Sequence, residues 1–194
     1  MIFVHGQLLP DSALPALLQK LEGEINETRE KRTLTPETVI SALDALGRRL
    51  ASGELDDLLK QYLPAGVDLA ALLPLLSRES LEHKLRIELG EDPFAPRDMA
   101  RTTARLAPLG TLLHVAAGNM PGLPVYSVVE GLLTGNVNLL KLPSGDSGLS
   151  LALLKLLTDT EPKLAPYVYV FSIPSSDRSS LQALADLSDG IVTW

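Results

Sequence analysis

The 194-residue chain carries 17 Lys and Arg residues against 24 Asp and Glu residues, and its net charge of -7, without any long basic cluster, argues against a nucleic-acid partner. It has no cysteine, which excludes disulfides, thiolate metal ligands and a cysteine nucleophile, and its three histidines fall at no ligand spacing, so we predict no metal. Hydrophobic residues make up 45% of the chain and aromatic residues only 4%, which suits helices of Leu, Ala and Val packed on a sheet.

The N-terminal part predicts a short strand and turn followed by helices. Residues 1–9 are rich in β-branched and aromatic types, contain Gly6 and are closed by Pro10, which is typical of an edge strand or hairpin. Between residues 11 and 90, apolar residues recur at three- and four-residue spacing. We therefore expect four or five short helices there.

Several residues mark where these helices begin and end. Thr35 places a capping hydroxyl before Pro36 at a first helical position, and Gly53 stands where that helix should end. Ser77 begins another predicted helix, which Gly90 ends.

The pattern changes near Pro96, where strands and helices begin to alternate. We place a boundary between residues 95 and 105, with a strand, turn and helical region over 1–100 and a partial nucleotide-binding α/β domain over 101–194. The expected strands are 111–117, 137–142, 167–173 and 191–194, and the expected helices are 125–133, 148–157 and 178–187. This alternation predicts an α/β fold with a parallel sheet and right-handed crossovers.

Two loops should lie at the carboxyl ends of the first two of these strands. Ligands gather at that edge of parallel sheets because helix N-termini there attract phosphate. The loop 116–122 offers glycines, a proline and the amide of Asn119, and the loop 141–146 offers Lys141 beside the hydroxyl of Ser144. We expect both loops to line one nucleotide.

The same residues also have structural interpretations. The dinucleotide fingerprint of spaced glycines and the Walker phosphate loop are both missing, and Gly118, Pro121 and Gly122 are ordinary punctuation between a strand and a helix. Asn119 would then hold its own turn, and Lys141 would be a solvated lysine at a strand edge. We interpret His114, within an apolar strand, as a core residue bonded to the backbone.

Two segments resemble a known family. Residues 108–122 (Pro-Leu-Gly-Thr-Leu-Leu-His-Val-Ala-Ala-Gly-Asn-Met-Pro-Gly) and 130–144 (Glu-Gly-Leu-Leu-Thr-Gly-Asn-Val-Asn-Leu-Leu-Lys-Leu-Pro-Ser) are similar to the cofactor domain of the aldehyde dehydrogenase superfamily. Gly118 stands where ordinary members usually carry Trp, which brings the chain closer to LuxC-type acyl-CoA reductases. Residues 188–194 look like the approach to that family's next nucleotide loop. The resemblance is specific over 105–194 and implies an incomplete Rossmann-like sheet of the aldehyde dehydrogenase type.

The resemblance also implies roles for single residues. Asn119 matches the side-chain amide that stabilises the oxyanion of the thiohemiacetal intermediate, a role in which one donor contributes roughly 3 kcal/mol. Lys141 matches the lysine that reaches the adenosine ribose or its 2′-phosphate. The other residues matched to the cofactor groove are Val115, Ala116, Pro143 and Ser144.

The cofactor that this pattern favours is NADP(H) over NAD(H). Lys141 is followed by Ser144, and Gly145 rather than an acidic residue comes directly after that serine. Asp146 is nearby and would oppose a 2′-phosphate, so the preference is modest.

The resemblance breaks at the nucleophile. The family's reaction passes the acyl group to a cysteine thiolate and then reduces it with a hydride from the nicotinamide, and the chain has no cysteine. It also ends at Trp194 within an expected strand. We therefore expect the N-terminal part of a longer reductase that turns a fatty acyl-CoA or related acyl thioester into an aldehyde. Alone it should bind nucleotide weakly, be inactive and self-associate through the exposed sheet edge.

The sequence is also compatible with two other functions. In a non-catalytic interaction module, helices within 11–90 would dock on a partner through leucines such as Leu69, Leu72, Leu73 and Leu76. A binder of acyl-CoA or another phosphorylated metabolite would take adenine ligands without preferring nicotinamide. We expect a cytoplasmic protein, since no apolar stretch reaches the ~18 residues of a membrane span and no secretory signal is present.

Overall fold

The computed structural model describes residues 1–63, 73–118 and 120–193. Within these residues, the centre of the molecule is a six-stranded sheet with the order β2-β1-β7-β6-β5-β8. Its strands are β1 (Ile2–Val4), β2 (Gln7–Leu9), β5 (Thr111–Val115), β6 (Val137–Lys141), β7 (Val168–Phe171) and β8 (Gly190–Thr193). The four strands from β5 to β8 are parallel, whereas β1 pairs with β7 in the antiparallel direction and β2 forms one edge. The expected α/β fold with a mostly parallel sheet is confirmed.

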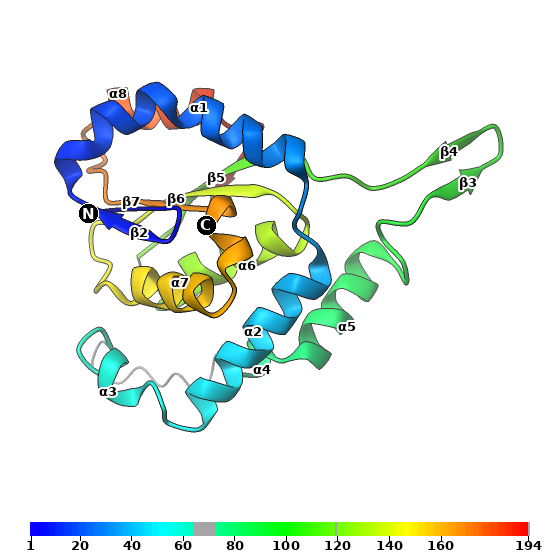
Figure 1. Ribbon diagram of the computed structural model, residues 1–194, viewed down its shortest axis with the longest axis horizontal. Coiled ribbons are helices and arrows are strands. Elements are labelled where there is room, and N and C mark those ends of the chain that lie inside the picture. Colours follow the sequence, from blue (N-terminus) through cyan, green and yellow to red (C-terminus); the bar gives the residue numbers. More distant parts are fainter. Residues whose placement is uncertain (64–72, 119, 194) are drawn as a thin grey trace.

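Helices cover both faces of this sheet. The described helices are α1 (Leu14–Lys31), α2 (Pro36–Ala51), α3 (Asp56–Leu59), α4 (Leu73–Leu76), α5 (Arg78–Leu89), α6 (Leu123–Leu133), α7 (Leu149–Thr160) and α8 (Arg178–Asp186), with 3-10 turns η1 (Asp11–Ala13) and η3 (Pro162–Tyr167). Figure 1 shows α1 and α8 on one face and α6 and α7 on the other. Helix α2 packs against α6 and α7 from outside, so the fold has a further helical layer on that side.

The expected alternation of strands and helices after residue 105 is present, with ends that shift by a few residues. Strand β5 ends at Val115 rather than at residue 117, and α6 begins at Leu123 rather than at 125. Strands β5, β6 and β7 are buried on both faces, which explains their nearly continuous apolar sequences.

Three features differ from the expectations. Helices α1 and α2 have 18 and 16 residues, so the N-terminal helices are not all short. The turn η3 precedes β7, where a strand was expected from residue 167. An antiparallel hairpin of β3 (Arg97–Met99) and β4 (Thr102–Ala104) extends from the body near the expected boundary (Figure 1). Its residues are all exposed, so no hydrophobic alternation signals it in the sequence.

The predicted N-terminal hairpin is confirmed. Strands β1 and β2 are joined by His5 and Gly6, both with positive φ, at 50° and 77°. Such angles favour glycine, so Gly6 suits the second turn position. The three residues of β1 are buried because this strand also pairs with β7, more than 160 residues away in the chain (Phe3 lies opposite Val170).

The predicted helix caps are also confirmed. The Thr35 hydroxyl accepts a hydrogen bond from the Thr38 amide at 3.2 Å, and the Ser77 hydroxyl accepts one from the Ser80 amide at 3.3 Å. Gly53 lies just after α2 with a φ of 76°.

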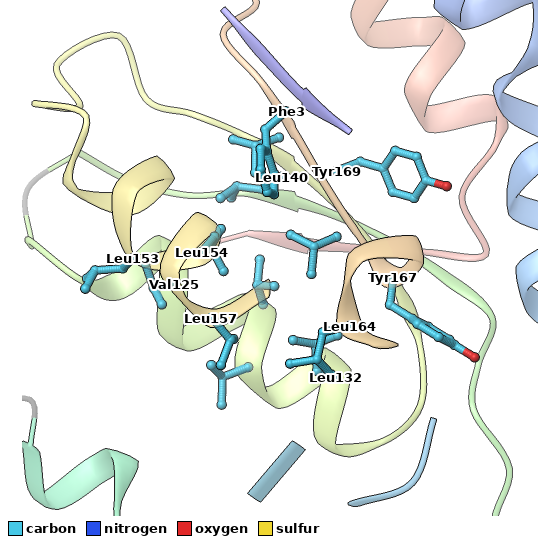
Figure 2. Packing of buried hydrophobic residues seen from close by; sticks show 14 of the residues in the cluster. Phe3, Val125, Leu132, Leu140, Leu153, Leu154, Leu157, Leu164, Tyr167 and Tyr169 are labelled. Atoms are coloured by element: carbon cyan, nitrogen blue, oxygen red, sulfur yellow. The ribbon is translucent and has the colours of Figure 1, made fainter. Parts of the chain in front are cut away.

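Residues from both sides of position 100 form one hydrophobic core. Figure 2 shows side chains of α6 and α7, such as Val125 and Leu154, gathered beneath Phe3 and Leu140 of the sheet. The same cluster includes buried leucines of α1 and α2. Leu73 and Leu76 of α4 pack against it, whereas Leu69 and Leu72 lie outside the described residues. The helical region therefore rests on the sheet, and the division near residue 100 stays a prediction.

Candidate functional site

Three strands of the sheet end side by side at the edge where the two expected loops begin. Val115 of β5 lies opposite Lys141 of β6, and Lys141 lies opposite Phe171 of β7. Because these strands are parallel, the segments that follow them all leave the sheet at its carboxyl edge. Val115 is half-buried and Ala116 is buried, so both lie at the floor of this edge.

Lys141 is buried at the centre of the sheet. Only 6% of the residue is exposed, and its ammonium donates a hydrogen bond to the Ser175 hydroxyl at 3.1 Å. Strand β6 lies between β5 and β7, so the interpretation as a solvated lysine at a strand edge is wrong. The contact instead ties the end of β6 to the loop after β7. Exposed Ser175 was not among the predicted site residues, since only the β7 register brings it to Lys141.

The two expected loops meet. Gly118 and Gly122 from the first loop and Pro143 and Gly145 from the second line a common hollow of about 50 Å³. A Cβ atom on Gly118 would lie 3.1 Å from the Pro143 Cβ, so the glycine permits this close approach. Asn119, the predicted oxyanion donor, lies outside the described residues.

Glycine conformation also contributes at the start of α6. Gly122 occupies the N-cap position with a φ of 84°, a left-handed conformation that favours glycine. Gly122 therefore has the structural role expected of a glycine between a strand and a helix. Gly118 has a different role, because it permits the close approach of the two loops.

Asp146 is held by the first turn of α7. Its two carboxylate oxygens accept hydrogen bonds from the Gly148 amide at 2.8 Å and from the Ser150 hydroxyl at 2.5 Å. The carboxylate lies at a helix N-terminus, where the helix dipole favours negative charge. Asp146 thus has a structural role in shaping the loop, and Ser144 on the same loop is exposed.

A larger cavity of about 870 Å³ lies on the α7 side of the same loop. Pro143 and Ser144 belong to its wall, together with Leu58 of α3 and Tyr62. The Ser147 hydroxyl donates a 2.5 Å hydrogen bond to the Tyr62 carbonyl, so the segment after α3 is docked on the loop. No sequence signal pointed to Tyr62, because its contact joins residues 85 positions apart.

His114 is a core residue, as expected, but its partners are side chains rather than the backbone. Its Nδ1 lies 2.7 Å from the Ser127 hydroxyl and its Nε2 lies 3.0 Å from the Asn138 amide oxygen. Burial lowers the pKa of His114, so its neutral form is favoured.

Two further observations concern metals and membranes. The described part of the chain holds no cluster of three or more His, Asp or Glu residues with a geometry for a metal ion. Within the same residues, every helix is too short or too polar to cross a lipid bilayer.

Comparison with known proteins places this arrangement in a family. The family model for acyl-CoA reductase (LuxC) matches residues 34–194, which is most of the chain and includes both loops. The chain belongs to the LuxC family of acyl-CoA reductases. The family model begins to match at residue 34, well before residue 105. The match therefore includes helical residues for which the sequence alone showed only a vague resemblance.

Two curated relatives bear the name long-chain acyl-protein thioester reductase. The protein from Vibrio harveyi is 28% identical over 127 residues, which cover 62% of this chain and 26% of the relative. The protein from Photorhabdus luminescens is 25% identical over 201 residues, which cover 93% of this chain and 41% of the relative. The chain thus spans less than half the length of either.

Proposed function

We propose that this LuxC-family chain is the nucleotide-binding part of an enzyme that reduces a long-chain acyl thioester to an aldehyde. The observation that carries the proposal is Lys141, which is buried at the carboxyl edge of the parallel sheet and whose ammonium is bonded to Ser175 on the loop after β7. A cation at that edge suits an anionic dinucleotide. The names of the two curated relatives support the thioester substrate.

In the proposed reaction, a bound nicotinamide dinucleotide supplies the hydride that reduces the acyl carbon. Lys141 binds the adenosine ribose or its 2′-phosphate, and Val115, Ala116, Pro143 and Ser144 line the groove. Asn119 donates its side-chain amide to the oxyanion. The thiolate that first accepts the acyl group comes from outside these 194 residues, which contain no cysteine.

NADP(H) is the preferred cofactor in this proposal. The Lys141 ammonium and the exposed Ser144 hydroxyl offer donors to a 2′-phosphate. The hydrogen bonds of Asp146 direct its carboxylate to the first turn of α7. This orientation reduces the electrostatic repulsion between the carboxylate and that phosphate.

The complete protein would be cytoplasmic.

The described chain would self-associate through β8. Within the described residues, β8 pairs only with β5, and Ile191 on this strand is 57% exposed. An unpaired strand edge favours pairing with another chain.

Dinucleotide titration tests the proposed nucleotide site. We expect the wild-type chain to bind NADPH more tightly than NADH, and Lys141→Ala to weaken NADPH binding about tenfold to hundredfold, since a hydrogen bond to a charged group contributes ~1.5–3 kcal/mol. Lys163→Ala, which removes an exposed lysine distant from this edge in the sequence, is the matched control and should bind as wild type does. Unchanged NADPH binding by Lys141→Ala would show that this site is not the nucleotide site.

A further inference from the structure

The 870 Å³ cavity has a lining that suits a hydrocarbon chain. Its walls come from Met1, from β2, from α3 and Tyr62, from one face of α7 and from the segments that follow β6 and β7. The apolar residues in this lining include Leu142, Leu151, Leu156 and Ile173. A cavity of this size is in the ~300–1,000 Å³ range of pockets that bury most of a small ligand.

Exposed apolar side chains gather at this cavity. Met1, Leu8 and Leu58 are 53%, 45% and 46% exposed, and all three line it, although they come from separate elements. They are three of the ten large hydrophobic residues that are exposed in the described chain. Large apolar groups left in contact with water around one hollow mark a binding site for an apolar ligand.

The charged groups of the lining already have partners. The Lys155 ammonium lies 2.6 Å from the Asp159 carboxylate, and Asp146 accepts two hydrogen bonds at the start of α7. A phosphate-bearing ligand would need free donors, whereas a hydrocarbon chain needs only apolar neighbours. Apart from the loop of Pro143 and Ser144, which the proposed nucleotide site shares, the lining therefore favours a chain over a nucleotide.

We propose that this cavity binds the hydrocarbon chain of a long-chain acyl ligand. The inference rests on the proposed function for the identity of the ligand, and it adds where the chain lies. Pro143 and Asp146 line both this cavity and the small hollow beside Gly118, so one loop separates the two. An acyl chain in the cavity has its functional end at that loop, next to the carboxyl edge of the sheet.

Binding should depend on chain length. Each buried methylene contributes ~0.8 kcal/mol, which corresponds to about a fourfold gain in affinity. Saturated fatty acids, kept below their micelle concentrations, should therefore displace the fluorescent fatty acid cis-parinaric acid more strongly with every added carbon, until the cavity is full.

Charged substitutions on two different elements of the wall test the location. Leu58→Glu and Leu8→Glu each place a carboxylate at the cavity while changing residues that are nearly half exposed, so the fold should tolerate them. Each should weaken cis-parinaric acid binding tenfold or more, because a buried charge beside the chain lacks a partner. The matched control is Ile87→Glu on α5, which changes an exposed apolar residue that does not line the cavity. Circular dichroism confirms the fold of all three variants.

The outcomes separate this inference from the proposed function. Chain-length-dependent binding that both wall variants weaken and Ile87→Glu leaves unchanged supports the acyl cavity, whether or not the chain binds NADPH. Fatty acid binding that is absent, or equal in all variants, overturns it. Displacement of cis-parinaric acid by NADPH, together with weaker NADPH binding in Leu58→Glu, would also overturn it and assign the cavity to the nucleotide.

Discussion

His114 on β5 and Asn138 on β6 are joined by a 3.0 Å contact between the ring Nε2 and the amide oxygen. The Asn138 amide nitrogen donates to the carbonyls of Asn136 and Tyr167, at 2.7 Å and 3.3 Å, so its oxygen is left to accept. The Nε2 atom therefore carries the proton, and Nδ1 accepts from the Ser127 hydroxyl. This network joins β5, β6, α6 and the turn before β7 inside the core.

The approach of α6 to this network depends on a glycine. A Cβ atom at Gly131 would lie 1.8 Å from the Asn138 amide oxygen, which leaves no room for a side chain. We expect Gly131→Ala to destabilise the fold by roughly 3 kcal/mol, through steric overlap and loss of the Asn138 hydrogen bonds. Urea denaturation measures the change.

Gly23→Ala is the matched control for that substitution. Gly23 is exposed within α1, and a Cβ atom there meets nothing within 4 Å. This variant should gain about 0.5–1 kcal/mol, because alanine favours a helix interior over glycine. Equal effects of the two substitutions would contradict the close packing at Gly131.

The low pKa of His114 predicts a specific pH dependence. The unfolded chain binds a proton at this histidine below about pH 6.5, whereas burial keeps the folded state neutral to lower pH. Stability should therefore be complete above that pH and fall on acidification, by at most ~1.4 kcal/mol per pH unit, until the lowered folded pKa is reached.

His114→Gln removes this titration. Its unfolding free energy should be lower than that of wild type near neutral pH, but should decline less between about pH 7 and pH 5.5. Glu37 titrates below this pH range, because the Arg78 guanidinium lowers the pKa of its carboxyl group to about 2. If the unfolding free energies of the two proteins fall equally over this pH range, the pKa of His114 is the same in the folded and the unfolded state.

Local rules predicted the parts of this fold that depend on neighbouring residues. The caps at Thr35 and Ser77 need only a side chain and an amide three positions on, and the apolar run of β5 indicates burial on both faces. Parallel pairing then places the loop after Val115 beside the loop after Lys141, as expected.

Long-range contacts explain what the sequence left unseen. The partner of Lys141 lies on the β7–α8 loop, and the docking of Tyr62 follows from how the helical region folds over α7. Residues separated by 34 and 85 positions carry no periodic signal of their proximity. The β3–β4 hairpin is exposed throughout, so burial leaves no pattern in its sequence.

Asp189 should stabilise the amino end of β5. Its carboxylate accepts a hydrogen bond from the Thr111 amide at 2.8 Å and lies 3.0 Å from the Arg29 guanidinium. Thr111 is fully buried, so its amide loses its partner in Asp189→Ala, which we expect to cost about 1–3 kcal/mol. Asp189→Asn keeps an acceptor and should lose less.

Thermal or urea unfolding of both Asp189 variants measures this difference. Asp186→Ala, at an exposed residue on α8, controls for loss of charge and should stay within about 0.5 kcal/mol of wild type. If Asp189→Ala matches that control, the Thr111 amide finds another partner, and the carboxylate has no stabilising role.

The 194-residue chain should carry out no thioester reduction by itself. In the proposed reaction a thiolate first attacks the acyl carbon and displaces CoA, and the chain has no cysteine to provide one. Incubation with a long-chain acyl-CoA and NADPH should therefore give no loss of NADPH absorbance above background, and a radiolabelled acyl group should not stay on the denatured protein. Nucleotide binding in the same preparation shows that the sheet is folded. Turnover that persists through further purification, with a labelled adduct on a serine or lysine, would mean that another side chain replaces the thiolate and that our mechanism is wrong.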